Sequence, residues 1–187
     1  DSISGAEFIY TGLQPLEQTL RQTSGVGAID ANFVPGGGLG AVQTSAFFNA
    51  VETNQSIKTQ FHSVELNRVR WGFDVVQTNI GMRYMWFEDD YKLVSRNNLG
   101  HTGTFSLSAV NQLIGPEVGL NLFYDVGRRV SFSGFGKLGG YLNFYRTDLD
   151  LINNAVQYLS NAHSDTNLSA SLDLGANAHM HLTRGVR

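Results

Sequence analysis

The chain has 187 residues, no cysteine, a formal net charge of −3 and a pI near 5.9. These values exclude a disulfide framework and a thiolate metal site, and they give no electrostatic reason to expect nucleic acid as a partner. No stretch approaches the roughly 18 consecutive apolar residues of a membrane-spanning helix, whereas 21 glycines, 12 phenylalanines and 7 tyrosines favour β structure.

Residues 1–55 are predicted to be a loop-rich part with at most one strand. "EFIY" at 7–10 reads as the beginning or end of a strand, "LQPLEQTLRQ" at 13–22 as a short helix, and "PGGGLGAV" at 35–42 as a glycine loop. The first ten residues, "DSISGAEFIY", have no basic segment followed by an apolar core, so no signal peptide is visible. An exported protein would have lost it, and a chain that starts at an internal point would also lack it.

Residues 56–187 are predicted to form long β-strands. The clearest pattern runs from Leu168 to Leu182, where every even position is apolar and every odd position is small or polar over fifteen residues. An ordinary strand has about five or six residues. The predicted strands lie at about 57–68, 74–87, 112–125, 130–145 and 167–183.

The predicted connections between these strands alternate in length. Tight turns are expected at 69–72, 126–129 and 184–187, and long polar loops at about 88–110 and 146–166. Short turns at one end and long loops at the other are typical of an outer-membrane barrel. The fold class predicted is therefore all-β, an antiparallel up-and-down transmembrane β-barrel or a partial wall of one.

Aromatic residues gather near the ends of the predicted strands. Phe132 and Phe144 are twelve residues apart, which at a tilt of about 40° spans about 30 Å, close to the thickness of a hydrocarbon core. We therefore expect a lipid-facing aromatic girdle; packing inside a soluble β-sandwich is the alternative. The girdle residues are Trp71, Tyr84, Trp86, Tyr124, Phe132 and Phe144.

The opposite faces of four successive strands carry charges of alternating sign. They are Arg83, Glu117, Lys137 and Asp173, at comparable distances from their turns. Unpaired charges in a confined interior cost several kcal/mol each, so we expect these to pair, with Glu117 facing Lys137 across a hairpin. Such a ladder would hold the barrel wall or line a polar channel; coincidence among few charges is the alternative.

The motifs for chemistry are weak. His179 and His181 share a face but have no firm third metal ligand, and "EDD" at 88–90 lacks the spacing of an EF-hand. Nucleophile and zinc-protease motifs do not occur. We therefore expect no cofactor, no metal site and no catalytic activity; a hydrolase using His101, His163 and Asp165 at the barrel rim is a minor alternative.

Two stretches resemble the beta-barrel porin-7 family of bacterial outer-membrane proteins. They are "FHSVELNRVRW…FDVVQTNIGMRYMWFEDDYKL" at 61–93 and "LIGPEVGLNLFYDVGRRVSFSGFGKLGGYLNF" at 113–144. The resemblance covers about 55–187 and implies an outer-membrane barrel without carrying over any catalytic residue. The chain departs from this pattern by stopping at "RGVR" rather than at an aromatic residue.

The expected function is therefore that of an outer-membrane barrel protein, either a porin-like passive channel or a barrel scaffold, with membrane lipid as its partner. The alternatives are an interaction protein whose long loops bind an S-layer, a glycan or a neighbouring barrel, and a soluble ligand-binding barrel. Because a single-chain transmembrane barrel usually needs at least eight strands, we expect either a piece of a longer protein or several identical chains completing one barrel.

Overall fold

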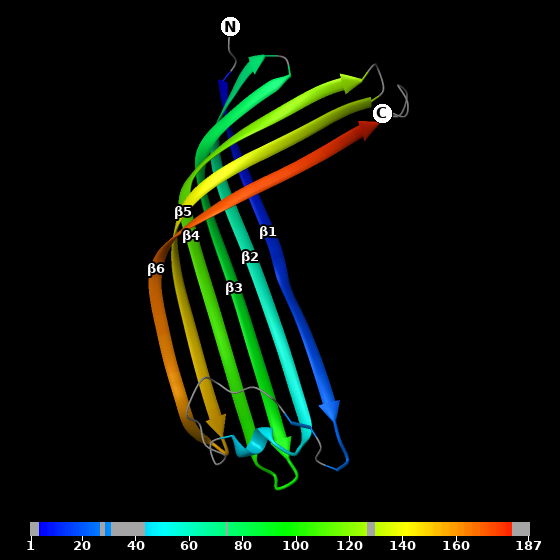
Figure 1. Cartoon of the computed structure of the whole chain (residues 1–187), viewed down its shortest axis with the longest axis vertical. Coiled ribbons are helices and arrows are strands. Elements are labelled where there is room, and N and C mark those ends of the chain that lie inside the picture. The colour runs from blue at the N-terminus through cyan, green and yellow to red at the C-terminus, as the bar shows by residue number, and fades with distance from the viewer. Residues whose placement is uncertain (1–3, 27–28, 31–43, 74, 127–129, 181–187) are drawn as a thin grey trace.

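In the computed structural model of this chain, the described strands form one six-stranded antiparallel sheet (Figure 1). The structure describes residues 4–26, 29–30, 44–73, 75–126 and 130–180. The strands follow one another in chain order, and a 3-10 helix, η1 (Ser45–Phe47), precedes the second. They are β1 (Ser4–Thr23), β2 (Ala50–Phe73), β3 (Val76–Asn97), β4 (Thr102–Val126), β5 (Val130–Asn153) and β6 (Val156–Met180). The predicted all-β, up-and-down antiparallel fold is confirmed.

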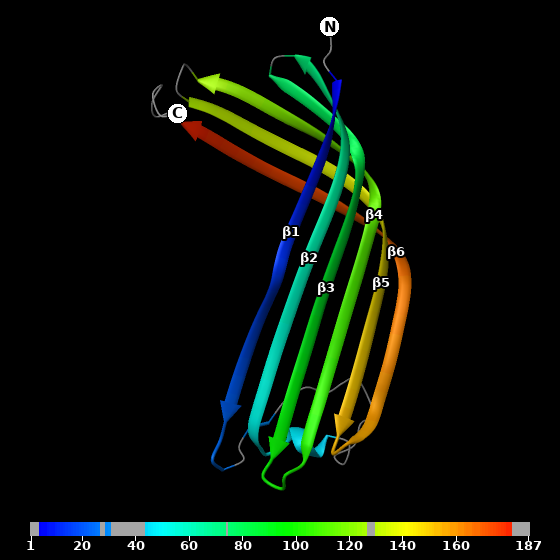
Figure 2. The same cartoon turned by 180° about the vertical axis from the view of Figure 1, so that it is seen from behind.

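The sheet is curved but not closed. Within the described residues, β1 and β6 each pair on one side only, so the sheet has two free edges (Figure 2). The strands lie side by side in the lower half of Figure 1, and β4, β5 and β6 turn sharply across the sheet in the upper half. The shape is that of a partial barrel wall.

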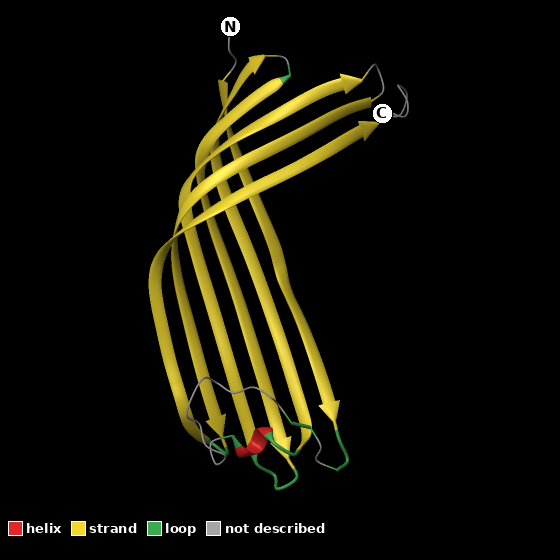
Figure 3. Ribbon diagram, in the orientation of Figure 1, coloured by secondary structure: helices red, strands yellow, loops and turns green. Residues whose placement is uncertain are grey.

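The long loops predicted at 88–110 and 146–166 are wrong, because these residues extend the strands (Figure 3). Along β3, Tyr91 and Leu93 are directed to one face and Glu88, Asp90 and Lys92 to the other, so the alternation continues with polar residues on the outer side. A strand with one solvated face has the composition of a loop, which explains the error.

The turns that join β3 to β4 and β5 to β6 are short and lie at the lower end of the sheet in Figure 1. Residues 98–101 join β3 to β4, and the Asn97 side chain accepts hydrogen bonds from the backbone of Leu99 and His101, both at 3.0 Å. Asn154 and Ala155 join β5 to β6 with φ values of 51° and 63°. Two successive positive φ values are typical of a tight type I′ hairpin, for which Asn-Gly is the usual sequence signal. The sequence did not predict this turn, because Ala155 stands where the usual signal has glycine.

The short helix predicted at 13–22 is also wrong, because these residues belong to β1. The pairing of β1 with β2 shifts between Leu13 and Leu16, where Pro15 has no N–H to donate. The strand predicted around 7–10 is confirmed.

The turn predicted at 69–72 is wrong, because β2 continues through these residues to Phe73. The predicted glycine loop at 35–42, most of the predicted turn at 126–129 and the chain beyond Met180 lie outside the described residues.

Glycine allows β4 and β5 to approach each other closely. The β4–β5 ladder skips Gly115 and Pro116 between Ile114 and Glu117 without a change of register, so Gly115 lies opposite Tyr141 and Pro116 opposite Gly140. A Cβ atom on Gly115 would overlap the carbonyl oxygen of Gly140, whereas a Cβ atom on Gly140 would point into open space. Gly115 therefore permits a close approach of two backbones that no other residue allows.

We expect Gly115→Ala to lower the free energy of unfolding by about 2–3 kcal/mol, the usual cost of forcing atoms into a filled space. Gly140→Ala is the matched control on the neighbouring strand and should change it by less than about 1 kcal/mol, since nothing lies within 4 Å of the added methyl. Guanidinium unfolding in detergent micelles, followed by tryptophan fluorescence, measures both. Equal effects of the two substitutions would contradict the role given to Gly115.

Candidate functional site

The register of the strands separates two faces of the sheet. Glu65 lies opposite Arg83, and their neighbours Leu66 and Met82 lie opposite each other on the other face. We call the face of Glu65 and Arg83 concave and the face of Leu66 and Met82 convex, because side chains of strands that are not neighbours meet on the former. Successive residues of a strand point to opposite faces, so each residue can be assigned from this register.

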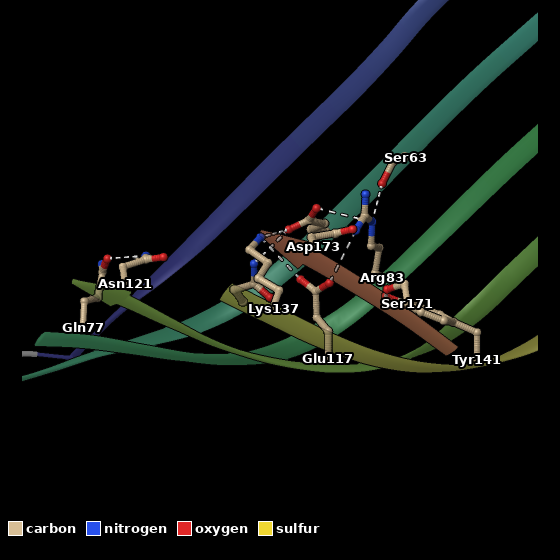
Figure 4. Close-up of polar contacts among 11 residues, drawn as sticks. Ser63, Gln77, Arg83, Glu117, Asn121, Lys137, Tyr141, Ser171 and Asp173 are labelled. Atoms are coloured by element: carbon tan, nitrogen blue, oxygen red, sulfur yellow. Dashed lines mark hydrogen bonds and ion pairs between the residues drawn. The ribbon is translucent and has the colours of Figure 1, made fainter. Parts of the chain in front are cut away.

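The structure brings together all four charged residues predicted as a ladder, on the concave face (Figure 4). An Nη1 atom of Arg83 lies 2.5 Å from Oδ2 of Asp173 and 3.9 Å from Oε2 of Glu117. Nζ of Lys137 lies 3.7 Å from Oε1 of Glu117. The prediction that these charges pair is confirmed.

Glu65 is a fifth member of this cluster that the ladder omitted. It lies 2.5 Å from Nζ of Lys137 and 3.4 Å from Nε of Arg83, so it contacts both cations. Its position between Ser63 and Asn67, opposite the apolar Val64 and Leu66, was the available signal in the sequence. We call Glu65, Arg83, Glu117, Lys137 and Asp173 the charge network.

The register explains how these long side chains fit. Glu117 does not lie directly opposite Lys137 as predicted: its partners are Gly81 and Gly139, and Lys137 lies opposite Gly119 and Asp173. The contact of Glu117 with Lys137 is therefore diagonal. The three network members of β3, β4 and β5, namely Arg83, Glu117 and Lys137, each lie opposite a glycine on a neighbouring strand, which leaves space over the backbone for a long side chain.

Two of the ion pairs cross the sheet rather than join neighbours. Lys137 of β5 reaches Glu65 of β2, and Arg83 of β3 reaches Asp173 of β6, so each pair spans three strand intervals. In a flat sheet those strands would be about 14 Å apart with parallel side chains. The side chains meet because the sheet curls around them, and the ion pairs of the charge network therefore cross the concave face at this level.

The network is well shielded from water. The Glu117, Glu65, Arg83 and Lys137 side chains are 1%, 7%, 12% and 13% exposed, and that of Asp173 is 39% exposed. Both carboxylate oxygens of Glu117 are buried without a hydrogen bond from any described residue, so Arg83 and Lys137 balance its charge. Two cations therefore meet three carboxylates in the charge network.

Neutral polar side chains extend the contacts along the same face. Asn121 donates to Gln77 at 2.7 Å, and the Ser171 hydroxyl lies 3.3 Å from that of Tyr141 (Figure 4). Arg83 also donates from Nε to the Ser63 hydroxyl at 2.9 Å. These contacts join neighbouring strands and hold the wall together on both sides of the charge network.

At the end of the sheet near the 98–101 turn, η1 covers the concave face. Phe47 is 1% exposed and packs with Leu93 and Leu151, around which Tyr91, Phe105 and Leu159 are partly buried. The Ser95 hydroxyl donates to the Ala46 carbonyl at 2.7 Å, and the Asn153 amide donates to the Ser45 hydroxyl at 3.0 Å. Burial here raises the pKa of the Tyr91 phenol. Sequence reasoning missed this anchor of the β1–β2 connection.

Phe47→Ala should lower the free energy of unfolding by about 3 kcal/mol, because it removes a fully buried ring and leaves a cavity. The adjacent Phe48 is 40% exposed, so Phe48→Ala should cost less than about 1 kcal/mol. Both effects are measured as shifts in the midpoint of denaturant unfolding, and the dependence of the unfolding free energy on denaturant concentration should stay unchanged. A Phe47→Ala midpoint equal to that of Phe48→Ala would show that η1 is not anchored.

Five of the six predicted girdle residues share the convex face: Tyr84, Trp86, Tyr124, Phe132 and Phe144. Tyr10 and His62 extend this set, since the His62 ring stacks on Trp86 at 5.4 Å and its Nδ1 lies 2.8 Å from the Tyr10 hydroxyl. The prediction is wrong for Trp71, which lies on the concave face and stacks on Phe123 at 5.3 Å. Its odd position on β2 assigns it to the face of Glu65.

The convex face carries no charge on β3, β4, β5 and β6 between the girdle levels. We call this surface the convex band, and much of it is exposed apolar side chain. Its exposed members include Ile80, Met82, Ile114, Val118, Leu120, Leu138, Leu142, Leu168, Leu172 and Leu174.

Within the described part of the chain, no group of three or more His, Cys, Asp or Glu residues is arranged to hold a metal ion. His181, one of the two histidines considered in the sequence, lies outside it. No described helix is long and apolar enough to cross a membrane. No protein-family model and no curated protein matches this chain.

Proposed function

We propose that this chain is a wall of an outer-membrane β-barrel whose interior is filled, and that it serves as a scaffold rather than as an open pore. The observation that carries the proposal is the charge network on the concave face behind the uncharged convex band. A soluble sandwich buries its apolar face and exposes its charged one, whereas here the apolar face is exposed and the charged face is covered. That inversion suits lipid outside and a confined polar interior.

The scaffold role is supported by the cross-sheet ion pairs. Arg83–Asp173 and Lys137–Glu65 occupy the space through which a solute would pass, and η1 covers the concave face nearer the 98–101 turn. Barrels of about eight strands have interiors just wide enough for side chains to fill. The alternative of an interaction protein depended on two long loops that bind a partner, and most of the residues predicted for those loops belong to strands.

The free edges of β1 and β6 require partners in lipid, where each unpaired backbone group costs several kcal/mol. Because β1 and β6 run in opposite directions, an even number of further antiparallel strands can join them, from a longer protein or from a second copy. The mass of the protein in detergent, with the lipid and detergent contributions subtracted, distinguishes a monomer of a longer chain from an assembly of copies. The resemblance to the beta-barrel porin-7 family stays a prediction.

Brominated lipid tests the membrane contact through the two tryptophans. In Trp71→Phe the remaining Trp86 is on the convex face, and in Trp86→Phe the remaining Trp71 is on the concave face. In vesicles of phosphatidylcholine brominated on the acyl chain, Trp86 fluorescence should be quenched strongly and Trp71 fluorescence little. Equal quenching of both, or quenching of neither, would overturn the proposal that the convex band contacts lipid.

Planar bilayers test the scaffold against the channel. The wild-type protein should give no steady conductance, because the charge network and η1 fill the interior. A stable ohmic conductance of the wild-type protein would overturn the scaffold role. If Asn121→Cys conducts in the same way and a cysteine-directed blocker abolishes its conductance, the channel passes along the concave face. The membrane assignment would survive that result.

A further inference from the structure

Two arginines are the exception to the neutral convex face at the end of the sheet near the β2–β3 turn. Arg68 and Arg70 lie on β2 within five residues of its end at Phe73, and both are exposed. Their neighbours Asn67 and Val69 are buried on the concave face, so the alternation fixes both guanidinium groups on the outer side. Near the β2–β3 turn, the described convex positions carry no other charge.

The arginines line two adjoining hollows, Arg70 the first and Arg68 both. The first, of about 460 Å³, is lined by Arg68, Arg70, Ser4, Thr78, Asn79 and Ile80. The second, of about 530 Å³, is the apolar hollow: it shares Ser4, Arg68 and Ile80 with the first and is also lined by Leu66 and Met82 further along the strands. The apolar side chains of Leu66, Ile80 and Met82 are exposed, at 61%, 60% and 50%. The surface thus has a cationic end toward the turn and an apolar end toward the middle of the strands.

The charge of Arg68 is not balanced by a described carboxylate. At the opposite end of the sheet, Arg96 pairs with Glu52 at 3.2 Å and Arg146 pairs with Asp148 at 2.8 Å. No such ion pair joins Arg68 to any residue that the structure describes. An exposed cation next to an exposed apolar surface fits an anion that carries its own apolar chain.

We propose that Arg68 and Arg70 bind the phosphate of an anionic phospholipid whose acyl chains lie along Leu66, Ile80 and Met82. The inference rests on the proposed membrane location. A guanidinium group offers planar paired donors that match phosphate oxygens, and arginines near the ends of membrane-crossing segments extend toward the headgroups. The apolar hollow favours a lipid over free phosphate, because phosphate has no apolar group to contact Leu66, Ile80 and Met82.

The absence of cysteine allows a direct test of which lipid lies beside the arginines. A single cysteine labelled with bimane is placed at Ile80, which lines both hollows, or at Leu174 on β6, which is convex but separated from β2 by three intervening strands. Each label is quenched in phosphatidylcholine vesicles containing a minor fraction of acyl-brominated phosphatidylglycerol or acyl-brominated phosphatidylcholine. The ratio of the two quenching constants cancels the difference in depth between the labels.

At Ile80→Cys, brominated phosphatidylglycerol should quench at least about fivefold more effectively than brominated phosphatidylcholine, as expected for one or two arginines near an anionic headgroup. At Leu174→Cys the ratio should be near one. In the Ile80→Cys protein, Arg68→Gln/Arg70→Gln should abolish the preference. Arg96→Gln/Arg146→Gln removes the same charge at the opposite end and should preserve it.

A ratio near one at Ile80→Cys with the arginines present, or a preference that survives Arg68→Gln/Arg70→Gln, would overturn the lipid site while leaving the membrane assignment intact. If brominated phosphatidylcholine quenches neither label, the proposed membrane location itself fails. Strong salt should weaken the preference at Ile80→Cys, because exposed charges are screened over about 3 Å at 1 M.

Discussion

Arg83→Ala should lower the free energy of unfolding by about 3–5 kcal/mol, the usual cost of removing one partner from a buried ion pair. Arg83 contacts all three carboxylates of the charge network, at 3.4 Å from Glu65, 3.9 Å from Glu117 and 2.5 Å from Asp173. Without it, three acidic groups share the single cation Lys137 in a space with little water. The measurement is guanidinium unfolding in detergent or vesicles, followed by tryptophan fluorescence.

The matched control is Arg146→Ala, which breaks an ion pair with Asp148 on the surface. The Arg146 side chain is 66% exposed, so its loss should change the free energy of unfolding by no more than about 1 kcal/mol. Equal effects of Arg83→Ala and Arg146→Ala would mean that the charge network does not stabilise the wall.

A double substitution separates charge from packing. Arg83→Ala/Asp173→Ala removes one cation and one carboxylate together and leaves Lys137 with Glu65 and Glu117. Since the two residues contact each other, the double variant should be more stable than Arg83→Ala alone, with a coupling of about 1–3 kcal/mol. A double variant less stable than Arg83→Ala would indicate that lost packing outweighs the unbalanced charge.

The alternation of the sequence predicted which residues share a face because the two-residue period of a strand leaves no other choice. Lys137 and Asp173 were assigned to one face on this basis, and they lie opposite each other in the register. The same period assigns Trp71 to the concave face, but its nearness to a turn was taken as a sign of the girdle. Position along a strand does not determine the face; parity does.

The partners within the charge network were harder to predict, because curvature is not a local property. Lys137 meets Glu65 only because β2 and β5 approach across the concave face, three strand intervals apart. That approach depends on the accumulated curl of the sheet. The order of the strands and their alternation therefore predicted which charges share the concave face, but not which of them meet across the sheet.

Leu172→Arg should lower the stability of the membrane-inserted protein by about 2–4 kcal/mol, the cost of an arginine on the lipid face near the bilayer midplane. Leu172 is 62% exposed on the convex band. On β6 it lies midway between Ala178, which pairs with Phe132, and Thr166, which pairs with Phe144. If the girdle marks the two interfaces, Leu172 is at the greatest depth that this strand reaches.

Ala162→Arg is the matched control on the same strand and the same face. Ala162 lies opposite Asp148, beyond the level of Phe144, where the convex side chains are polar. An arginine there should cost no more than about 1 kcal/mol, because the penalty falls toward the interface. Both variants are compared with wild type by denaturant unfolding in vesicles. In a protein whose convex band faced water, both arginines would be nearly neutral, so equal small effects would rule out the membrane assignment.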